Sequence, residues 1–347
     1  MKRPALLIIT TLLAITASAQ TVFFTSSQQY TAAQLQAFYA SVNIGDSLVI
    51  FNAPDYQLYA YDKTKGHMVW TRPLDRKSNT APFFAGGYIW AWAREQVVKL
   101  DPATGNELRK LDAKTIETQP VVRNGILYFT GIQDGGSIIA YDLKADTVVW
   151  KRFIAHGSSK APYYWPQKMV VNAEADQWIE FRYDGAFVSA GCGANADAFP
   201  SELPCVKRFI ALTHDREEIK GKRAEKMRLT EAGPTAISTT AHQTFILQEG
   251  FLYALGNKLR EKMSVELATL SDDLEYDRDL PLQLLSVTDD QVSILYNHQL
   301  LVYHLKDKKL VKRIDLSAWQ PHQAILEGSR LWVISGKDGL LYGLQMD

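Results

Sequence analysis

The side chains of this 347-residue chain that could do acid–base or metal chemistry are dispersed along the sequence. None of the histidines belongs to a His-Glu-x-x-His metal motif, and no Gly-x-Ser-x-Gly elbow marks a nucleophilic serine. We therefore predict no catalytic residue and no metal ligand, and interpret each histidine as structural. The seven histidines are His67, His156, His214, His242, His298, His304 and His322.

Two charged segments could bind ligands, but each has a simpler interpretation. Residues 272–279 carry five acidic side chains that could converge on a calcium ion. An EF-type loop needs glycine at its sixth position, which is Arg278 when the count starts at Asp273. We interpret the segment as a solvated loop. Residues 215–228 change from acidic to basic, which favours an exposed hairpin over a docking surface for an acidic partner.

The first 19 residues have the pattern of a signal peptide. Two basic residues precede an apolar stretch from Ala5 to Ile15, and residues 17–19 are the small residues that a signal peptidase reads. The stretch is too short to span a bilayer, for which a helix needs about 20 residues. We predict cleavage before Gln20 and export of a soluble protein to the periplasm or the extracellular space, with no membrane span and no lipid anchor.

Export determines how the two cysteines are interpreted, because the compartments outside the cytoplasm are oxidising. Cys192 and Cys205 flank a stretch rich in Gly, Ala, Asn and Pro, and they are too far apart for a Cys-x-x-Cys redox motif. We predict a disulfide between them, with a redox or metal role as the alternative. A bridge that closes a loop of about 14 residues stabilises by about 3 kcal/mol in the chain-entropy model.

The overall composition excludes some partners and favours strands. Lys plus Arg equals Asp plus Glu at 38 each, so no excess of charge calls for nucleic acid or an anionic membrane. Aromatic residues make up 11% of the chain alongside 21 glycines, which is typical of a β-rich protein with many tight turns.

A repeat organises these elements. The fullest unit has an apolar run that ends in Asp, a glycine four residues later and a tryptophan eight residues after the Asp. The third unit has Asp146 in place of the glycine. The clearest members are Asp62, Gly66 and Trp70; Asp101 and Gly105, with Arg109 in the tryptophan position; and Asp142 and Trp150. The three aspartates are 39 and 41 residues apart, and degenerate copies continue to the C-terminus. Units of this length made of short strands predict a radial array of four-stranded sheets.

We therefore predict an all-β fold, a single β-propeller over residues 20–347, with seven blades and eight as the alternative. The fourth unit contains an insertion around residues 184–206. The last unit ends after its third strand, so we expect residues 21–24 to supply the fourth strand and close the ring. Residues 30–40 are expected to form a short helix.

The repeat resembles the tryptophan-docking repeats of the pyrroloquinoline quinone (PQQ)-like propellers, including the BamB-like propellers. The resemblance implies that the Asp and Gly residues shape the hairpin turns and that the Trp residues wedge between blades. By this resemblance, the residues expected to shape the turns or to wedge between blades are Asp62, Gly66, Trp70, Asp101, Gly105, Asp142 and Trp150.

The resemblance leaves two functional types open. Quinoprotein dehydrogenases are larger, bind PQQ with calcium and, in the alcohol type, carry a disulfide between adjacent cysteines that this chain lacks. BamB-like propellers bind partners and catalyse no reaction. We expect a non-enzymatic monomer without a cofactor that binds a protein or a small ligand on one rim, with the insertion contributing to that surface. The alternatives are a PQQ-dependent oxidoreductase and a hydrolase or lyase with a dispersed channel site. The aromatic residues 163–165 are interpreted as core rather than as a binding platform.

Overall fold

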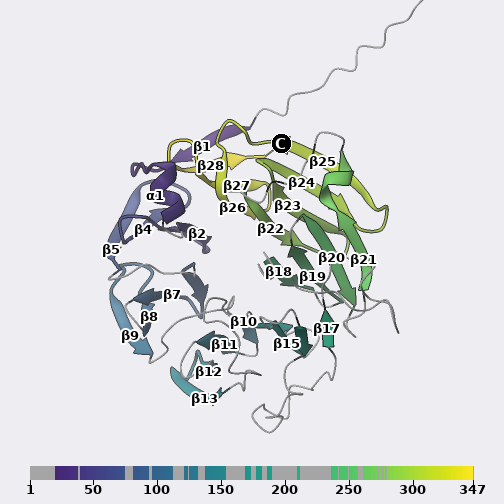
Figure 1. The fold of residues 1–347 in the computed structure, drawn as a ribbon. Coiled ribbons are helices and arrows are strands. Elements are labelled where there is room, and N and C mark those ends of the chain that lie inside the picture. The colour runs from purple at the N-terminus through teal and green to yellow at the C-terminus, as the bar shows by residue number, and fades with distance from the viewer. Residues whose placement is uncertain are drawn as a thin grey trace, which may run out of the picture.

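In the computed structural model, the first and last strands of the chain meet within one ring of sheets (Figure 1). The residues that the structure describes are 20–37, 40–74, 81–93, 96–111, 121–123, 125–131, 137–153, 169–172, 177–181, 186–189, 209–211, 236–240, 242–248, 250–256, 261–271, 274, 277 and 280–346.

These residues form seven four-stranded antiparallel sheets, which confirms the predicted seven-bladed propeller. The strands of blades 1 to 3 are β2 (Ser41–Ile44), β3 (Leu48–Asn52), β4 (Gln57–Asp62) and β5 (Met68–Pro73); β6 (Phe83–Ala85), β7 (Tyr88–Ala93), β8 (Gln96–Leu100) and β9 (Glu107–Leu111); and β10 (Val121–Arg123), β11 (Ile126–Gly131), β12 (Ser137–Asp142) and β13 (Thr147–Phe153).

The remaining blades follow the same order. Their strands are β14 (Met169–Asn172), β15 (Gln177–Phe181), β16 (Ala186–Ser189) and β17 (Phe209–Ala211); β18 (Ala236–Thr239), β19 (Gln243–Gln248), β20 (Phe251–Gly256) and β21 (Glu261–Glu266); β22 (Leu282–Val287), β23 (Gln291–Tyr296), β24 (Gln299–His304) and β25 (Lys309–Asp315); and β26 (Pro321–Glu327), β27 (Arg330–Ser335), β28 (Leu341–Gln345) and β1 (Thr21–Thr25). A 3₁₀ turn, η2 (Leu267–Leu270), follows β21.

The N-terminal strand closes the ring, as the sequence predicts. β1 pairs antiparallel with β28, from Thr21 opposite Gln345 to Thr25 opposite Tyr342, and completes blade 7. Phe24 of β1 is buried against Trp332 and Tyr61, which belong to blades 7 and 1. The strand therefore holds the last blade to the first.

A short helix, α1 (Ala32–Ala37), lies between β1 and β2 within the predicted range. Thr31 and Gln34 cap it reciprocally, since the Gln34 amide donates to Thr31 Oγ1 at 3.2 Å and the Thr31 amide donates to Gln34 Oε1 at 2.8 Å. Leu35 is buried in the apolar cluster shared by blades 7 and 1, so the helix covers the closure of the ring.

The core lies between blades rather than within them. One cluster joins Ile50 and Trp70 of blade 1 to Ile89 and Val98 of blade 2, and comparable clusters join blades 2 and 3, 5 and 6, 6 and 7, and 7 and 1. A single sheet cannot bury both of its faces, so each blade depends on its neighbours.

Amide side chains also join the first strands of neighbouring blades, which lie innermost in the ring (Figure 1). Gln283 Oε1 accepts from the Ala324 amide at 2.8 Å, Gln323 Oε1 accepts from the Val42 amide at 2.9 Å, and Asn43 Nδ2 donates to the Pro82 carbonyl at 2.7 Å. These bonds link blades 6, 7, 1 and 2 in sequence.

The antiparallel topology separates two kinds of connection. The links between first and second strands and between third and fourth strands leave a blade on one face, and the blade-to-blade links leave on the other. β16 lies inside the insertion predicted around 184–206, so the connection itself runs from residue 190 to residue 208 between the third and fourth strands of blade 4. It therefore starts and ends on the face of the short Asp-containing turns.

Among the described residues, no helix has the length and apolarity needed to cross a membrane.

Candidate functional site

The three repeat aspartates organise the turns between third and fourth strands. In each turn the Asp Oδ1 accepts the backbone amides two and three residues further on. The acceptor–donor pairs are Asp62 with Thr64 (2.9 Å) and Lys65 (2.6 Å), Asp101 with Ala103 (2.7 Å) and Thr104 (3.3 Å), and Asp142 with Lys144 and Ala145 (both 2.8 Å). The hydrogen bond from the Lys65 amide is the main cause that lowers the pKa of Asp62.

Glycine occupies the left-handed position of the first two turns and leaves room for the neighbouring blade. Gly66 has φ +72°, and a Cβ there would lie 3.1 Å from the Phe24 ring of blade 7. Gly105 has φ +70°, and a Cβ there would lie 2.7 Å from the Trp70 ring of blade 1. Phe24 thus occupies in blade 7 the place that Trp70 occupies in blade 1.

Trp70 forms the joint between blades 1 and 2. Its ring covers Gly105, and its Nε1 donates to the Pro102 carbonyl at 2.8 Å. Arg72 extends the joint with an ion pair to Glu107 at 2.8 Å and a hydrogen bond to the Gly105 carbonyl at 3.2 Å. The indole therefore has both an apolar partner and a hydrogen-bond acceptor in the next blade.

A methyl group at Gly105 is expected to damage this joint. Gly105→Ala combines a left-handed backbone with a contact against the indole, so we expect it to lower the free energy of unfolding by about 2–4 kcal/mol in urea denaturation. Gly87→Ala is the matched control, because Gly87 has φ +78° with nothing within 4 Å of its Cβ position. The control should cost about 1 kcal/mol; equal losses would show that the contact with Trp70 contributes nothing.

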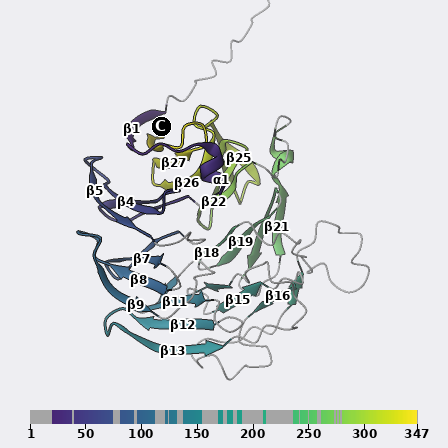
Figure 2. The same cartoon turned by 60° about the vertical axis from the view of Figure 1, so that its left-hand side comes forward.

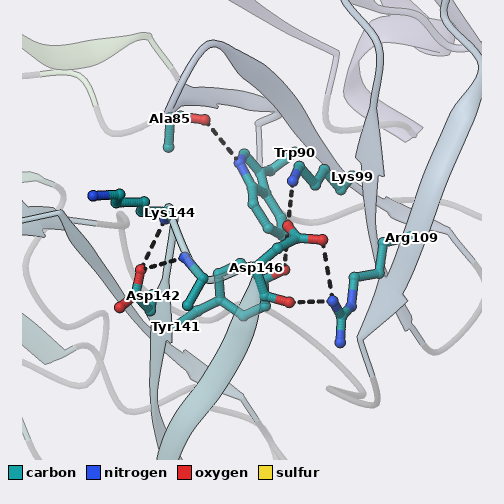
Figure 3. Close-up of polar contacts among 9 residues, drawn as sticks. Ala85, Trp90, Lys99, Arg109, Tyr141, Asp142, Lys144 and Asp146 are labelled. Atoms are coloured by element: carbon teal, nitrogen blue, oxygen red, sulfur yellow. Dashed lines mark hydrogen bonds and ion pairs between the residues drawn. The ribbon is translucent and has the colours of Figure 1, made fainter.

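The joint between blades 2 and 3 is built from charges (Figure 3). Asp146 stands at the left-handed turn position with φ +56° and receives hydrogen bonds from three side chains. Lys99 Nζ binds its Oδ1, Tyr141 Oη donates to Oδ1 at 2.6 Å, and Arg109 Nη1 lies 3.1 Å from Oδ2 and also binds the Asp146 carbonyl. The hydrogen bonds from Lys99 and then Tyr141 lower the pKa of Asp146 to about 2. The carboxylate is therefore ionised throughout the physiological range.

In most outermost strands, a β-bulge lies one residue before the tryptophan position of the repeat. In β5, for example, Trp70 is opposite Ala60 and Met68 is opposite Tyr61, which leaves Val69 without a partner on β4. Bulges re-aim the following side chain, here onto the next blade. Five of the six outermost strands that contain such a bulge expose an apolar side chain at it, and the sixth has Lys262. The five are Phe23, Val69, Leu108, Val149 and Val311.

These exposed residues form a recurrent feature of the circumference. Leu108 is 51% exposed and Val149 is 53% exposed. Blades 7, 1 and 3 each expose a second apolar neighbour in the same strand, namely Val22, Met68 and Val148. The strands β5, β9 and β13 follow one another along one side of the ring (Figure 2). We call these bulge residues the outer apolar row. They are Val311, Phe23, Val69, Leu108 and Val149, which lie on the consecutive blades 6, 7, 1, 2 and 3.

The other candidates from the sequence are not brought together. Among the residues described, no three His, Cys, Asp or Glu side chains are grouped closely enough to hold a metal ion. His322 is partly buried, and that burial lowers its pKa, whereas His304 pairs with Asp307 at 2.9 Å. Of the five acidic side chains in 272–279, Asp277 alone is described.

Several predictions concern residues outside the described part of the chain. They include the signal peptide, Cys192 and Cys205, residues 163–165 and 215–228, His156 and His214. The backbone of Trp150 is described, and it pairs with Ala140 at the register position that Trp70 and Ala60 occupy in blade 1.

The repeat places Arg109 in the tryptophan position and Asp146 in the position of Gly66, but the sequence pattern assigns no role to Asp146 or to Lys99. A signal for the role was present, because a cation replaces the tryptophan of one unit and an aspartate replaces the glycine of the next.

Comparison with known proteins agrees with this geometry. The family described as outer membrane protein assembly factor BamB matches residues 93–186, which cover β8 to β15 and the charged joint. The crystal structure of BamB from Moraxella catarrhalis is similar to 88% of this chain and 82% of that one, with 15% identity and a TM-score of 0.52. The resemblance to PQQ-like propellers is confirmed.

Two further solved structures share the propeller fold. The computationally designed Ika8 protein covers 94% of this chain and 99% of its own length, at 12% identity and a TM-score of 0.56. BBS1N, solved in complex with ARL6DN, covers 95% and 97% at 12% identity and a TM-score of 0.61. No curated protein matches the chain. At these identities, the likeness to the three solved structures concerns the fold alone.

Proposed function

We propose that this PQQ-like propeller is a non-catalytic interaction scaffold that binds a partner protein at the outer apolar row. The observation that supports it most is the repetition of an exposed apolar side chain at the bulge of five consecutive blades. Exposed apolar side chains mark an interaction surface where they lie together, and blades 7, 1 and 3 each add a second exposed apolar side chain beside the row. The closed ring holds these positions in a fixed geometry, so a partner is bound without remodelling the blades.

The test compares apolar and polar positions on the same strands. Val69→Gln with Leu108→Gln places amides at the row on β5 and β9, and Thr71→Gln with Lys110→Gln places the same side chain at exposed neighbours. Each immobilised protein is incubated with an envelope extract of the source organism, and the retained proteins are identified by mass spectrometry. We expect a discrete protein that the wild type and the control retain and the row variant loses. Equal retention by both variants would contradict the proposal.

Export is part of the proposal. β1 starts at Thr21, one residue after the predicted mature terminus at Gln20, so cleavage there leaves the closing strand whole. The Gln20 side chain already contacts blade 6, where Nε2 donates to the Asp315 carbonyl at 3.0 Å. The intact mass of protein isolated from the envelope fraction should correspond to a chain that starts at Gln20, whereas a full-length cytosolic protein would refute export.

The predicted disulfide is supported by the strands that flank it. β16 and β17 pair through Val188 and Phe209, so the chain leaves and re-enters blade 4 at neighbouring positions. Cys192 and Cys205 lie three residues after β16 and four residues before β17. In the exported protein, we expect reduction to add the mass of two hydrogen atoms and to lower the free energy of unfolding by about 3 kcal/mol. Free thiols before reduction would refute the bridge.

The alternative hypothesis is that the protein is a PQQ-dependent oxidoreductase. We propose that the protein works without this cofactor. Incubation with PQQ and calcium, followed by gel filtration, should leave the protein without bound chromophore and without dye-linked oxidation of alcohols or sugars. A stable chromophore with turnover would overturn the scaffold proposal.

A further inference from the structure

The charged joint replaces the tryptophan joint position by position. On adjacent strands of blade 1, Ala60 is paired with Trp70, and at the same register of blade 2, Lys99 is paired with Arg109. The facing turns differ correspondingly, with Gly105 opposite Trp70 and Asp146 opposite Arg109. Three positions therefore change together between the two joints. Ala60, Trp70 and Gly105 of the first joint correspond to Lys99, Arg109 and Asp146 of the second.

The charges of this unit are unequally buried. The Lys99 side chain is 6% exposed, and its Nζ lies 3.9 Å from the centroid of the Tyr88 ring. Asp146 is 41% exposed and Arg109 is 40% exposed. Solvent ions therefore reach the pair of Arg109 and Asp146, while Lys99 stays in the apolar region between the blades and depends on Asp146 for neutralisation.

The two joints should respond differently to ionic strength. Salt weakens the exposed ion pair of Arg109 and Asp146, whereas it does not weaken the apolar contact of Trp70 in the other joint. The ion pair of Arg72 and Glu107 in the tryptophan joint is less exposed, so salt should affect it less.

Once Arg109 releases Asp146, the contact with Lys99 still holds the turn of blade 3. Leu143 also holds this turn, because it packs on the apolar cluster of blades 2 and 3. If the Lys99 contact also opens, the buried ammonium is left without a counter-charge, so the two ion pairs should open together.

From this arrangement we infer that the joint between blades 2 and 3 is a salt-sensitive seam, which loosens before the tryptophan joint of blades 1 and 2 as ionic strength rises. The contacts that hold this seam closed are the hydrogen bonds of Asp146 with Lys99, Arg109 and Tyr141. The inference concerns the ring itself and stands independently of the scaffold proposal.

Hydrogen exchange measured by mass spectrometry at about 0.05 M and about 1 M NaCl tests the seam. Amides of β9 and β12 flank the charged joint, and amides of β4 and β5 belong to the blade that docks through Trp70. We expect exchange in β9 and β12 to accelerate at least threefold at high salt, with a clearly smaller acceleration in β4 and β5. Equal responses at the two joints, or no response at either, would overturn the inference.

A joint swap supplies the decisive variant. Lys99→Ala with Arg109→Trp and Asp146→Gly installs at blades 2 and 3 the residues found at blades 1 and 2. The salt response of β9 and β12 should disappear in this variant. Arg109→Gln is the second variant, since it removes a half-exposed charge and leaves Lys99 paired. It should accelerate exchange already at low salt and reduce the further effect of salt. A salt response that is unchanged in either variant would contradict the seam.

Discussion

Replacing Phe24 with alanine is expected to lower the free energy of unfolding by about 3–5 kcal/mol. Phe24 is 5% exposed and packs at 5.3 Å, centroid to centroid, against both Tyr61 and Trp332. It also covers Gly66 in the turn of blade 1. Its loss opens a cavity where β1 fastens the last blade to the first, so the effect should appear in urea denaturation as a lower midpoint.

The neighbouring phenylalanine is the control for this prediction. Phe23 lies at the bulge of the same strand and is 39% exposed, with its ring 5.2 Å from Trp332 and under the Arg330 guanidinium. Phe23→Ala should cost about 1 kcal/mol. If the two variants lose the same stability, β1 does not close the ring through Phe24.

Trp70→Ala should have an effect of similar size, about 3–5 kcal/mol. The variant removes the ring that covers Gly105 and the donor to the Pro102 carbonyl, and these contacts join blades 1 and 2. Trp70→Phe keeps part of the packing but loses the donor, so it should retain more stability than Trp70→Ala.

Val69→Ala controls for the strand itself, because Val69 precedes Trp70 and is an exposed bulge residue. Its free energy of unfolding should change by about 0.5 kcal/mol or less. Denaturation of all three variants under identical conditions checks the order. A Trp70→Ala protein as stable as Val69→Ala would contradict the role of the indole as a joint.

The ring could be predicted from the sequence because its repeats are local. The spacing of Asp62, Asp101 and Asp142 gives the blade length, and the missing fourth strand of the last unit points to residues 21–24 as the closing strand. Both inferences need only the pattern of short runs along the chain.

The joints between blades could not be predicted in the same way. Arg109 and Asp146 are 37 residues apart, and their contact exists only once blades 2 and 3 are side by side. The bulges at Val69 and Leu108 depend on which residues the adjacent strand pairs, and the sequence does not encode this as a motif. The outer apolar row follows from those bulges, so it too required the structure.

Site-specific photo-cross-linking in living cells of the source organism tests the scaffold proposal most directly. A photoreactive residue is placed in turn at Val69 and Leu108 in the outer apolar row, and at Thr71 and Lys110 on the same strands as controls. The proposal predicts a discrete protein adduct from the row positions and none from the controls. No adduct at any row position, or equal adducts at all four positions, would contradict it.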